Sequence, residues 1–160
     1  MKNLKETLYK NLLIKEKLII NKNTKINEYH PKNKDELQDI VNKLIKERGN
    51  EANLNDIDTS EITDMSGLFK YSNFDGDISK WDVSNVEDMA KMFYGSKFTG
   101  ENGDISKWDV SNVKSMYKMF TRSKFNGNIT NWDISNVEKN FAMFRFSPLG
   151  KNPPKWYKSI

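Results

Sequence analysis

The sequence predicts an α/β fold, a solenoid of about four short strand-plus-helix units of the leucine-rich-repeat type with a helical N-terminal cap. A strongly periodic helical segment precedes the repeats. Each repeat carries a phenylalanine, at spacings of 24, 27 and 24 residues: Phe69, Phe93, Phe120 and Phe144. Each also carries one copy of an aspartate-centred motif, of which the first copy is degenerate: 54–62, 77–86, 104–113 and 128–137. Because a single repeat cannot bury its own apolar side, neighbouring repeats must stack.

The N-terminal segment 1–52 is expected to cover one end of this stack. Its clearest element is a helix over 33–48, in which Asn33 and Glu36 form a capping box. Gly49 follows the last apolar position and can end the helix. The apolar stripe has the i, i+3, i+4, i+7, i+8 spacing of a buried helix face: Leu37, Ile40, Val41, Leu44 and Ile45.

The residues before this helix give a weaker pattern. Leucines at every fourth position, Leu4, Leu8 and Leu12, favour a short helix within 1–20. The apolar run 18–20 and the segment 25–29 favour strands instead.

Each repeat, over 53–147, divides into two parts. Trp81 and Val83 alternate with polar residues, which predicts a short strand with the tryptophan buried. Met89, Met92 and Phe93 then fall at i, i+3 and i+4, which predicts a short helix that faces the core. The tail 148–160 is rich in proline, and its aromatic residues are expected to fold back over the other end of the stack.

The composition excludes several classes of protein. Cysteine is absent, so disulfides and thiolate metal sites are excluded. No run of about 20 apolar residues is present, which argues against membrane insertion. Residues 1–50 hold 12 Lys and Arg against 7 Asp and Glu, whereas 51–160 hold 14 against 15. The repeats are therefore not a basic platform for nucleic acid.

The repeats resemble the BspA-like leucine-rich repeat proteins, also described as the mycoplasma-type lipoprotein repeat family. The Asp-Ile-Ser-Lys-Trp-Asp-Val-Ser-Asn-Val motif, the Met-x-x-Met-Phe that follows it and the Phe-x-Gly turn carry this resemblance over roughly residues 30–157. The resemblance implies a right-handed solenoid without a known active site, and often a surface or adhesion role. A signal peptide and a lipid-bearing cysteine are missing from the sequence, so a cytoplasmic location is expected unless a leader was removed.

The candidate binding residues form rows on the predicted outer face of the strands. Aspartates and serines recur at the same positions of successive repeats, with two lysines just before them: Asp58, Lys80, Asp82, Ser84, Lys107, Asp109, Ser111 and Asp133. One interpretation is a strip that recognises a partner protein, and another is a cation site of stacked carboxylates. The alternative is structural, with Asp and Ser bonded to backbone amides so that they hold the turns in place.

A second candidate contact lies in the basic N-terminus, at Lys5, Lys10, Lys15 and Lys17. Such spaced lysines usually form a solvated face, but they could also meet an acidic protein or a nucleic-acid backbone. His30 is the only histidine, and it has no second histidine or cysteine with which to share a metal. Neither a nucleophile motif nor a phosphate loop is present, so no catalytic residue, cofactor or metal is predicted.

The sequence therefore predicts a non-enzymatic module that binds another protein. The first hypothesis is an intracellular inhibitor of a partner, of the immunity or phage anti-defence (anti-CRISPR) type. The second is a cell-surface adhesion protein of the BspA-like type. The third is nucleic-acid binding through the lysine-rich N-terminus. The sequence does not indicate the oligomeric state.

Overall fold

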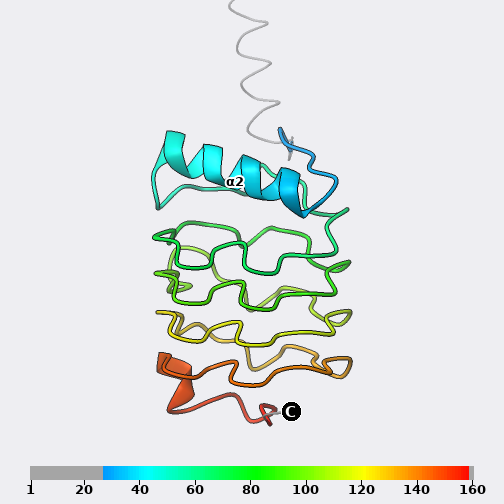
Figure 1. Ribbon diagram of the computed structural model, residues 1–160, viewed down its shortest axis with the longest axis vertical. Coiled ribbons are helices and arrows are strands. Elements are labelled where there is room, and N and C mark those ends of the chain that lie inside the picture. The colour runs from blue at the N-terminus through cyan, green and yellow to red at the C-terminus, as the bar shows by residue number, and fades with distance from the viewer. Residues whose placement is uncertain (1–26, 159–160) are drawn as a thin grey trace, which may run out of the picture.

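The computed structural model describes residues 27–158, which form a stack of layers with a helix across one end (Figure 1). Helix α2 spans Lys34–Arg48, and the short 3-10 helix η1 spans Pro148–Gly150. Between them the chain makes one layer per repeat: 53–76, 77–103, 104–127 and 128–150. The predicted elements of 1–20, including the strand at 18–20, lie outside the described residues.

Helix α2 occupies the range that the sequence predicts. The Asn33 side chain accepts the backbone N–H of Glu36 at 3.0 Å, a capping bond that contributes about 1 kcal/mol. Leu37, Val41 and Leu44 are fully buried against the first layer. The Gly49 amide closes the other end on the Ile45 carbonyl at 2.8 Å. The helix therefore lies across the first layer as an apolar cover (Figure 1), and its charged residues such as Asp35, Asp39 and Lys46 are exposed.

The prediction of strand-plus-helix units is wrong. Within residues 27–158 the helices are α2 and η1, and the repeats pair through isolated parallel bridges rather than through a sheet. These bridges join Tyr29 to Ile57, Asn53 to Asp77, Asp64 to Asp88, Asp88 to Ser115, and Ser115 to Lys139. The right-handed solenoid of the leucine-rich-repeat type is therefore not the fold of this chain.

Turns replace the expected strand in the first part of each repeat, which we name the Trp segment (53–64, 77–88, 104–115 and 128–139). The Trp81 amide donates to the Ile78 carbonyl at 3.2 Å, and the Val86 amide donates to Val83 at 2.9 Å. The Asp82 carboxylate accepts the Ser84 amide at 3.0 Å. These local bonds use the N–H groups that a strand would offer to its neighbour, so no ladder extends along the segment.

Turns also replace the expected helix in the second part, which we name the Met-Phe segment (65–72, 89–96, 116–123 and 140–147). Each segment has two left-handed residues four positions apart, such as Lys91 at φ 57° and Gly95 at φ 65°. The amides of Met92 and Ser96 close turns on the carbonyls three residues earlier, at 3.2 and 3.1 Å. A positive φ at the third turn residue is typical of type II turns and is incompatible with an α-helix.

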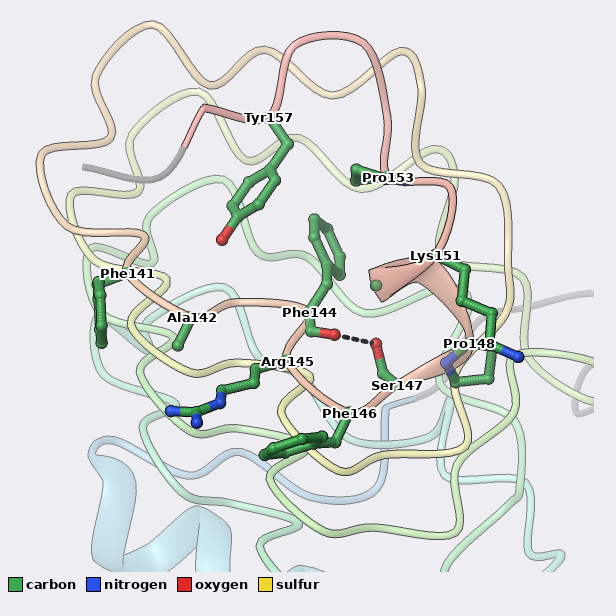
Figure 2. A pocket seen from close by; sticks show the side chains of 11 residues that line it. Phe141, Ala142, Phe144, Arg145, Phe146, Ser147, Pro148, Lys151, Pro153 and Tyr157 are labelled. Atoms are coloured by element: carbon green, nitrogen blue, oxygen red, sulfur yellow. Dashed lines mark hydrogen bonds between the residues drawn. The ribbon is translucent and has the colours of Figure 1, made fainter.

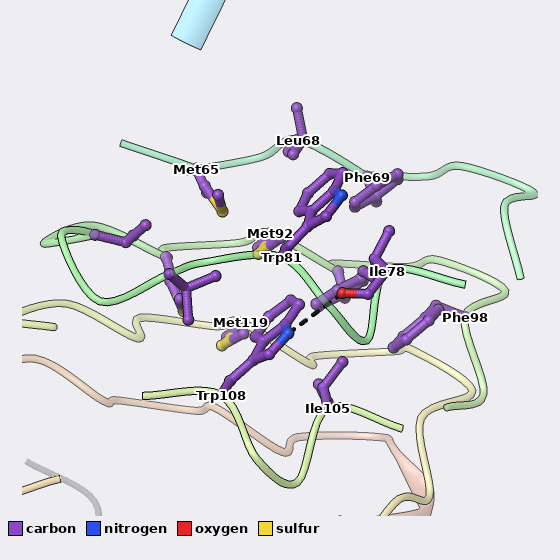
Figure 3. Close-up of a cluster of buried hydrophobic side chains, with 14 of the residues drawn as sticks. Met65, Leu68, Phe69, Ile78, Trp81, Met92, Phe98, Ile105, Trp108 and Met119 are labelled. Atoms are coloured by element: carbon purple, nitrogen blue, oxygen red, sulfur yellow. Dashed lines mark hydrogen bonds between the residues drawn. The ribbon is translucent and has the colours of Figure 1, made fainter. Parts of the chain in front are cut away.

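The core lies between the two kinds of segment, and aromatic rings run through it from layer to layer. Trp81, Trp108 and Trp132 are at most 5% exposed, which confirms that the tryptophans are buried. The phenylalanines of successive Met-Phe segments stack at 5.5 to 5.9 Å with interplanar angles of 1–5°. Figure 3 shows Trp81 and Trp108 packed beside the methionines and phenylalanines of the facing segments. Stacked pairs of this kind add about 0.5–1.5 kcal/mol beyond their buried area.

Each tryptophan also ties its layer to the one before. The indole Nε1 of Trp81 donates to the Leu54 carbonyl at 2.9 Å, and that of Trp108 donates to Ile78 at 3.3 Å (Figure 3). In both cases the acceptor already receives a backbone amide of its own layer, as Ile78 does from Trp81. One carbonyl therefore holds a turn and a neighbouring layer together.

The tail continues this register. Trp156 lies 24 residues after Trp132, and its Nε1 donates to the Ile129 carbonyl at 3.1 Å. Tyr157 packs edge-on against Phe144, at 4.9 Å between ring centroids. The aromatic residues of the tail thus do fold back onto the fourth layer, as the sequence predicts.

The second repeat, 77–103, is three residues longer than the repeats on either side of it, and the extra residues lie at one corner of the stack. Thr99 donates its amide to the Asp75 carboxylate at 2.8 Å, and Asn102 donates its side-chain amide to the Asp75 carbonyl at 2.7 Å. Gly103 lies directly against Gly76, where an added Cβ would be 2.9 Å from a carbonyl oxygen. The insertion is therefore held by the previous layer, outside the paired segments.

Candidate functional site

The aspartate row that the sequence singles out lies at the turns of the Trp segments, not on a sheet. The carboxylates of Asp58, Asp82 and Asp109 each accept the amide of the serine two residues later, at 3.0 to 3.1 Å. The hydroxyls of the same serines donate to them at 2.6 to 2.7 Å. Asp133 accepts the Ser135 amide at 3.0 Å in the same way. This is the structural arrangement that the sequence offers as the alternative to a binding strip.

The hydrogen bonds stabilise the charged form of these carboxylates. The Ser111 hydroxyl and amide lower the pKa of Asp109, and the Ser135 hydroxyl and amide lower the pKa of Asp133. Both carboxylates remain exposed to solvent. A partner could therefore meet them as fixed negative charges that are already oriented.

A ladder of asparagines lies in the same segments. The side-chain amides of Asn85, Asn112 and Asn136 donate to serine carbonyls of the preceding layer at 2.7 to 2.8 Å. His30 lies beside the first aspartate of the row, with Nδ1 3.3 Å from the Asp58 carboxylate. Both features hold neighbouring segments together.

Lys80 and Lys107 are exposed on the Trp segments, but acidic side chains outnumber them there. The four Trp segments hold 12 Asp and Glu against 4 Lys. The basic N-terminal residues Lys5, Lys10, Lys15 and Lys17 lie outside the described residues.

The Met-Phe segments carry the opposite charge, a feature that was not predicted from the sequence. They hold five Lys and Arg and no Asp or Glu: Lys70, Lys91, Lys118, Arg122 and Arg145. Because Phe69 of one segment packs against Trp81 of the other kind, at 5.9 Å between ring centroids, the two kinds of segment face each other across the core. Their outward surfaces therefore lie on opposite sides of the molecule.

Exposed aromatic rings lie among these cations. Tyr71, Phe141 and Phe146 are 64%, 54% and 67% exposed, and they are the large apolar side chains that stand out from the described surface. We name this surface the basic-aromatic face: Lys70, Tyr71, Lys91, Tyr94, Tyr117, Lys118, Arg122, Phe141, Arg145 and Phe146. Exposed rings that gather on one face, unlike ones scattered singly, are typical of an interaction surface.

Cation–π contacts, both within a layer and between neighbouring layers, order this face. The ammonium groups of Lys91 and Lys118 lie 5.6 and 4.9 Å from the centre of the Tyr117 ring. The Arg122 and Arg145 guanidinium groups lie 5.7 and 4.8 Å from the centre of the Phe146 ring. Cation–π contacts of this type each contribute about 0.5–1 kcal/mol at exposed sites. The long side chains are therefore partly oriented before any partner arrives.

Two tyrosines on the face have altered acidity. The Lys118 ammonium, hydrogen-bonded to the phenol, lowers the pKa of Tyr117. The Tyr94 hydroxyl, hydrogen-bonded to Tyr71, raises the pKa of Tyr71. Tyr71 also packs edge-on against Tyr94 at 5.3 Å, and its ring covers the position where Gly95 has no side chain.

The face could have been found in the sequence by counting charge separately for the two halves of each repeat. The overall balance of the repeats is nearly neutral, which hides a negative half and a positive half. The exposed aromatic residues gave no such signal, because Phe and Tyr in a helix-like pattern read as core.

Residues 27–158 contain neither a cluster of metal-ligating side chains nor a membrane-spanning helix. No group of three or more His, Asp or Glu side chains in this range converges as metal ligands would. Neither α2 nor η1, the helices of the described chain, has the length and hydrophobicity of a membrane span.

Comparison with protein families gives one match. The family model described as Mycoplasma protein of unknown function, DUF285, matches residues 22–156, a range that includes α2, all four layers and Trp156. No curated protein matches the chain. No solved structure matches it either.

Proposed function

The chain belongs to the DUF285 family of Mycoplasma proteins, and from the charge and exposure of its surface we propose that it is a non-enzymatic module that binds another protein. The observation that carries this proposal is the basic-aromatic face. Arginine and tyrosine are enriched among the few residues that contribute most of the binding energy at protein interfaces. A face with five cations and no carboxylate best complements an acidic protein surface.

The layered core favours this function because it holds the face rigid. The side chains of the face project from turns whose neighbours, such as Phe93 and Phe120, are fully buried. A surface that is ordered beforehand loses less conformational entropy when a partner docks. The cation–π pairs around Tyr117 and Phe146 add to that order.

Single-stranded nucleic acid is the competing ligand, since it also binds surfaces with cations and exposed rings. Base stacking requires open ring faces. Cations of the chain already lie over the rings of Tyr117 and Phe146, within 4.9 and 4.8 Å of their centres. This arrangement favours contacts through charge and ring edges, which suit an acidic protein better than a row of bases.

The mode of action that we propose is inhibition. A small rigid module that offers complementary surface acts most simply by covering a working surface of its partner, as immunity proteins and phage anti-defence inhibitors do. The aspartates Asp58, Asp82, Asp109 and Asp133 would give a second contact of opposite charge. The finer assignment within the family, to the BspA-like proteins and their adhesive role at the cell surface, is the alternative, and it is supported by the repeated Asp-Ile-Ser-Lys-Trp-Asp motif.

A capture experiment with charge-reversed variants tests the proposal. Immobilised chain is exposed to a nuclease-treated lysate of its source organism, and the bound proteins are identified by mass spectrometry. The test variant carries Lys118→Glu and Arg122→Glu, and the matched control carries Lys107→Glu on the opposite side. We expect a specific partner to bind the wild type and the control but not the test variant, and the purified partner to lose activity when the chain is added.

Three outcomes would contradict the proposal. One is equal capture by all three proteins, and another is capture that survives both the cation reversals and Asp82→Lys with Asp109→Lys. The third is binding to a labelled single-stranded oligonucleotide with no protein partner. Salt dependence of that oligonucleotide binding would then support the nucleic-acid function instead.

A further inference from the structure

At the C-terminal end of the stack, three backbone donors have no acceptor among residues 27–158. In every inner Met-Phe segment, alternate amides donate to carbonyls of the next layer: Gly67, Phe69 and Tyr71 to Ala90, Met92 and Tyr94; Lys91, Phe93 and Gly95 to Tyr117, Met119 and Thr121; Lys118, Phe120 and Arg122 to Phe141, Met143 and Arg145. These nine bonds are 2.8 to 3.1 Å long. The same three positions of each segment therefore always point along the stack toward a covering segment.

In the last Met-Phe segment these positions are Ala142, Phe144 and Phe146. No residue of 27–158 accepts a hydrogen bond from their backbone amides. The tail covers the other part of the fourth layer, where Trp156 bonds to Ile129. Amides of buried residues are almost always paired in folded proteins, and Phe144 is only 2% exposed. The open row of donors is therefore an unfilled place in an otherwise regular pattern.

An apolar cavity lies over these donors (Figure 2). It measures about 1100 Å³, and Phe144, Phe146, Pro148 and Tyr157 provide much of its wall. The charged residues that line it are basic, since Arg145 and Lys151 are both there and no acidic side chain is. Figure 2 shows the Arg145 and Lys151 side chains at the edge of the cavity, with Phe144 and Tyr157 at its centre.

We propose that this open end binds an acidic, apolar main-chain segment of a partner protein, paired to the amides of Ala142, Phe144 and Phe146. In the inner layers, the equivalent place is filled by a backbone whose alternate carbonyls accept these amides and whose apolar side chains lie below them. We expect the occupant to have the same chemistry. Main-chain pairing of this kind is a common way to bind a peptide to an open edge. Arg145 and Lys151 select for acidic residues beside the apolar ones.

A second copy of the chain fits this end poorly. Two such ends brought together would place donors against donors, and helix α2 covers the opposite end of the stack. The inference deepens the proposed function, because it adds a second site to a protein-binding module. The two sites share Arg145 and Phe146, but Lys151 belongs to this end alone, and Lys91 and Lys118 belong to the basic-aromatic face alone.

The test uses a synthetic peptide with the sequence of residues 87–96, the segment that covers 65–71 inside the chain. The peptide contains two acidic residues, and within the chain its carbonyls accept the amides of Gly67, Phe69 and Tyr71. The ¹⁵N-labelled full chain is titrated with the peptide, and amide hydrogen exchange is measured by NMR. We expect the signals of Ala142, Phe144 and Phe146 to shift and their exchange to slow by about tenfold or more.

Two variants separate this site from the face. Lys151→Glu should weaken peptide binding by about fivefold, as expected for an exposed charge pair that becomes repulsive. Lys118→Glu should leave it unchanged. A peptide with both acidic residues replaced by their amides should also bind more weakly.

The contrary results distinguish a failure of this inference from a failure of the proposed function. The inference is overturned when the three amides stay unshifted at millimolar peptide, or when the shifts appear at Lys91 and Lys118, in which case the proposed function stands. It is also overturned when the three amides are already protected in the free chain and that protection depends on protein concentration, since a second copy would then be the occupant. Failure of the lysate capture with success of the peptide titration would contradict the proposed face alone.

Discussion

Replacement of Trp81 by phenylalanine tests the bond that ties one layer to the next. Trp81 is 3% exposed, and its Nε1 donates to the Leu54 carbonyl at 2.9 Å. Leu54 also accepts the Ile57 amide at 3.2 Å, so its carbonyl keeps one partner in the Trp81→Phe variant. The loss of the bond should therefore cost about 1 kcal/mol, at the lower end of the range for a buried acceptor.

The smaller ring adds a packing term. Phenylalanine is smaller than tryptophan by roughly 40 Å³, which corresponds to about 1 kcal/mol when the cavity does not collapse. The expected loss of unfolding free energy is therefore about 2 kcal/mol. With a urea dependence of about 2 kcal/mol per molar, the unfolding midpoint should fall by about 1 M.

Urea unfolding followed by far-UV circular dichroism measures this shift, and Trp156→Phe is the matched control. Trp156 donates the same bond, to Ile129 at 3.1 Å, but it lies partly exposed in the outermost layer. Its replacement should lower the midpoint by less than half as much. Equal shifts for the two variants, or a Trp81→Phe midpoint within about 0.2 M of the wild type, would refute the idea that the indole bonds hold the layers together.

Two further predictions concern the turns. Gly95→Ala should destabilise the chain more than Gly67→Ala in urea unfolding. Both glycines have positive φ, which alone costs an alanine about 1 kcal/mol, but only at position 95 would the new Cβ lie 2.6 Å from a Tyr71 ring atom. Equal losses of unfolding free energy in the two variants would show that the ring contact is unimportant. Asp109→Asn keeps an acceptor oxygen but removes the charge whose pKa the Ser111 hydroxyl and amide lower. A lowered pKa stabilises the folded state at pH values above the ordinary aspartate pKa, and this stability is lost as the pH falls through the folded-state pKa. The difference in unfolding free energy between wild type and Asp109→Asn should therefore shrink between about pH 6 and about pH 3. A difference that stays constant or grows would contradict the stabilising role of the Asp109 charge.

Local signals predicted part of this fold. Helix α2 was predictable because its caps at Asn33 and Gly49 and its apolar stripe all lie within one short segment. The burial of Trp81 and Trp108 was predictable from the recurrence of tryptophan in successive repeats. These features depend on neighbours in sequence or on the repeat spacing, both of which are visible in the chain.

The conformation inside each repeat was not predictable in the same way. Met89, Met92 and Phe93 have helical spacing, yet the same three side chains reach the core from two successive turns. The left-handed residues that make this happen are glycine at Gly95 but lysine at Lys91, and lysine carries no sequence signal for positive φ. Hydrogen bonds to the next layer compensate the local strain of these positive φ angles. Residue propensities describe only local preference, so they cannot predict such long-range compensation.

The basic-aromatic face was not predicted from the sequence, for a similar reason. The aspartates of the Trp segments stood out because they repeat, but repetition also marks residues such as Asp82 that hold turns. The residues of the basic-aromatic face differ from layer to layer, as Tyr71, Gly95, Arg122 and Phe146 do at one position. Variation on a fixed scaffold is where a binding surface is expected, and it is invisible to a search for repeats.

The corner loop at 99–103 has a consequence for how such chains change length. Asp75 anchors this loop through Thr99 and Asn102, while the segments before and after it keep their bonds to the adjoining layers. Additional residues can therefore be inserted at that corner without displacing any layer of the stack. The corner is thus a natural position at which to graft a foreign epitope or a reporter peptide.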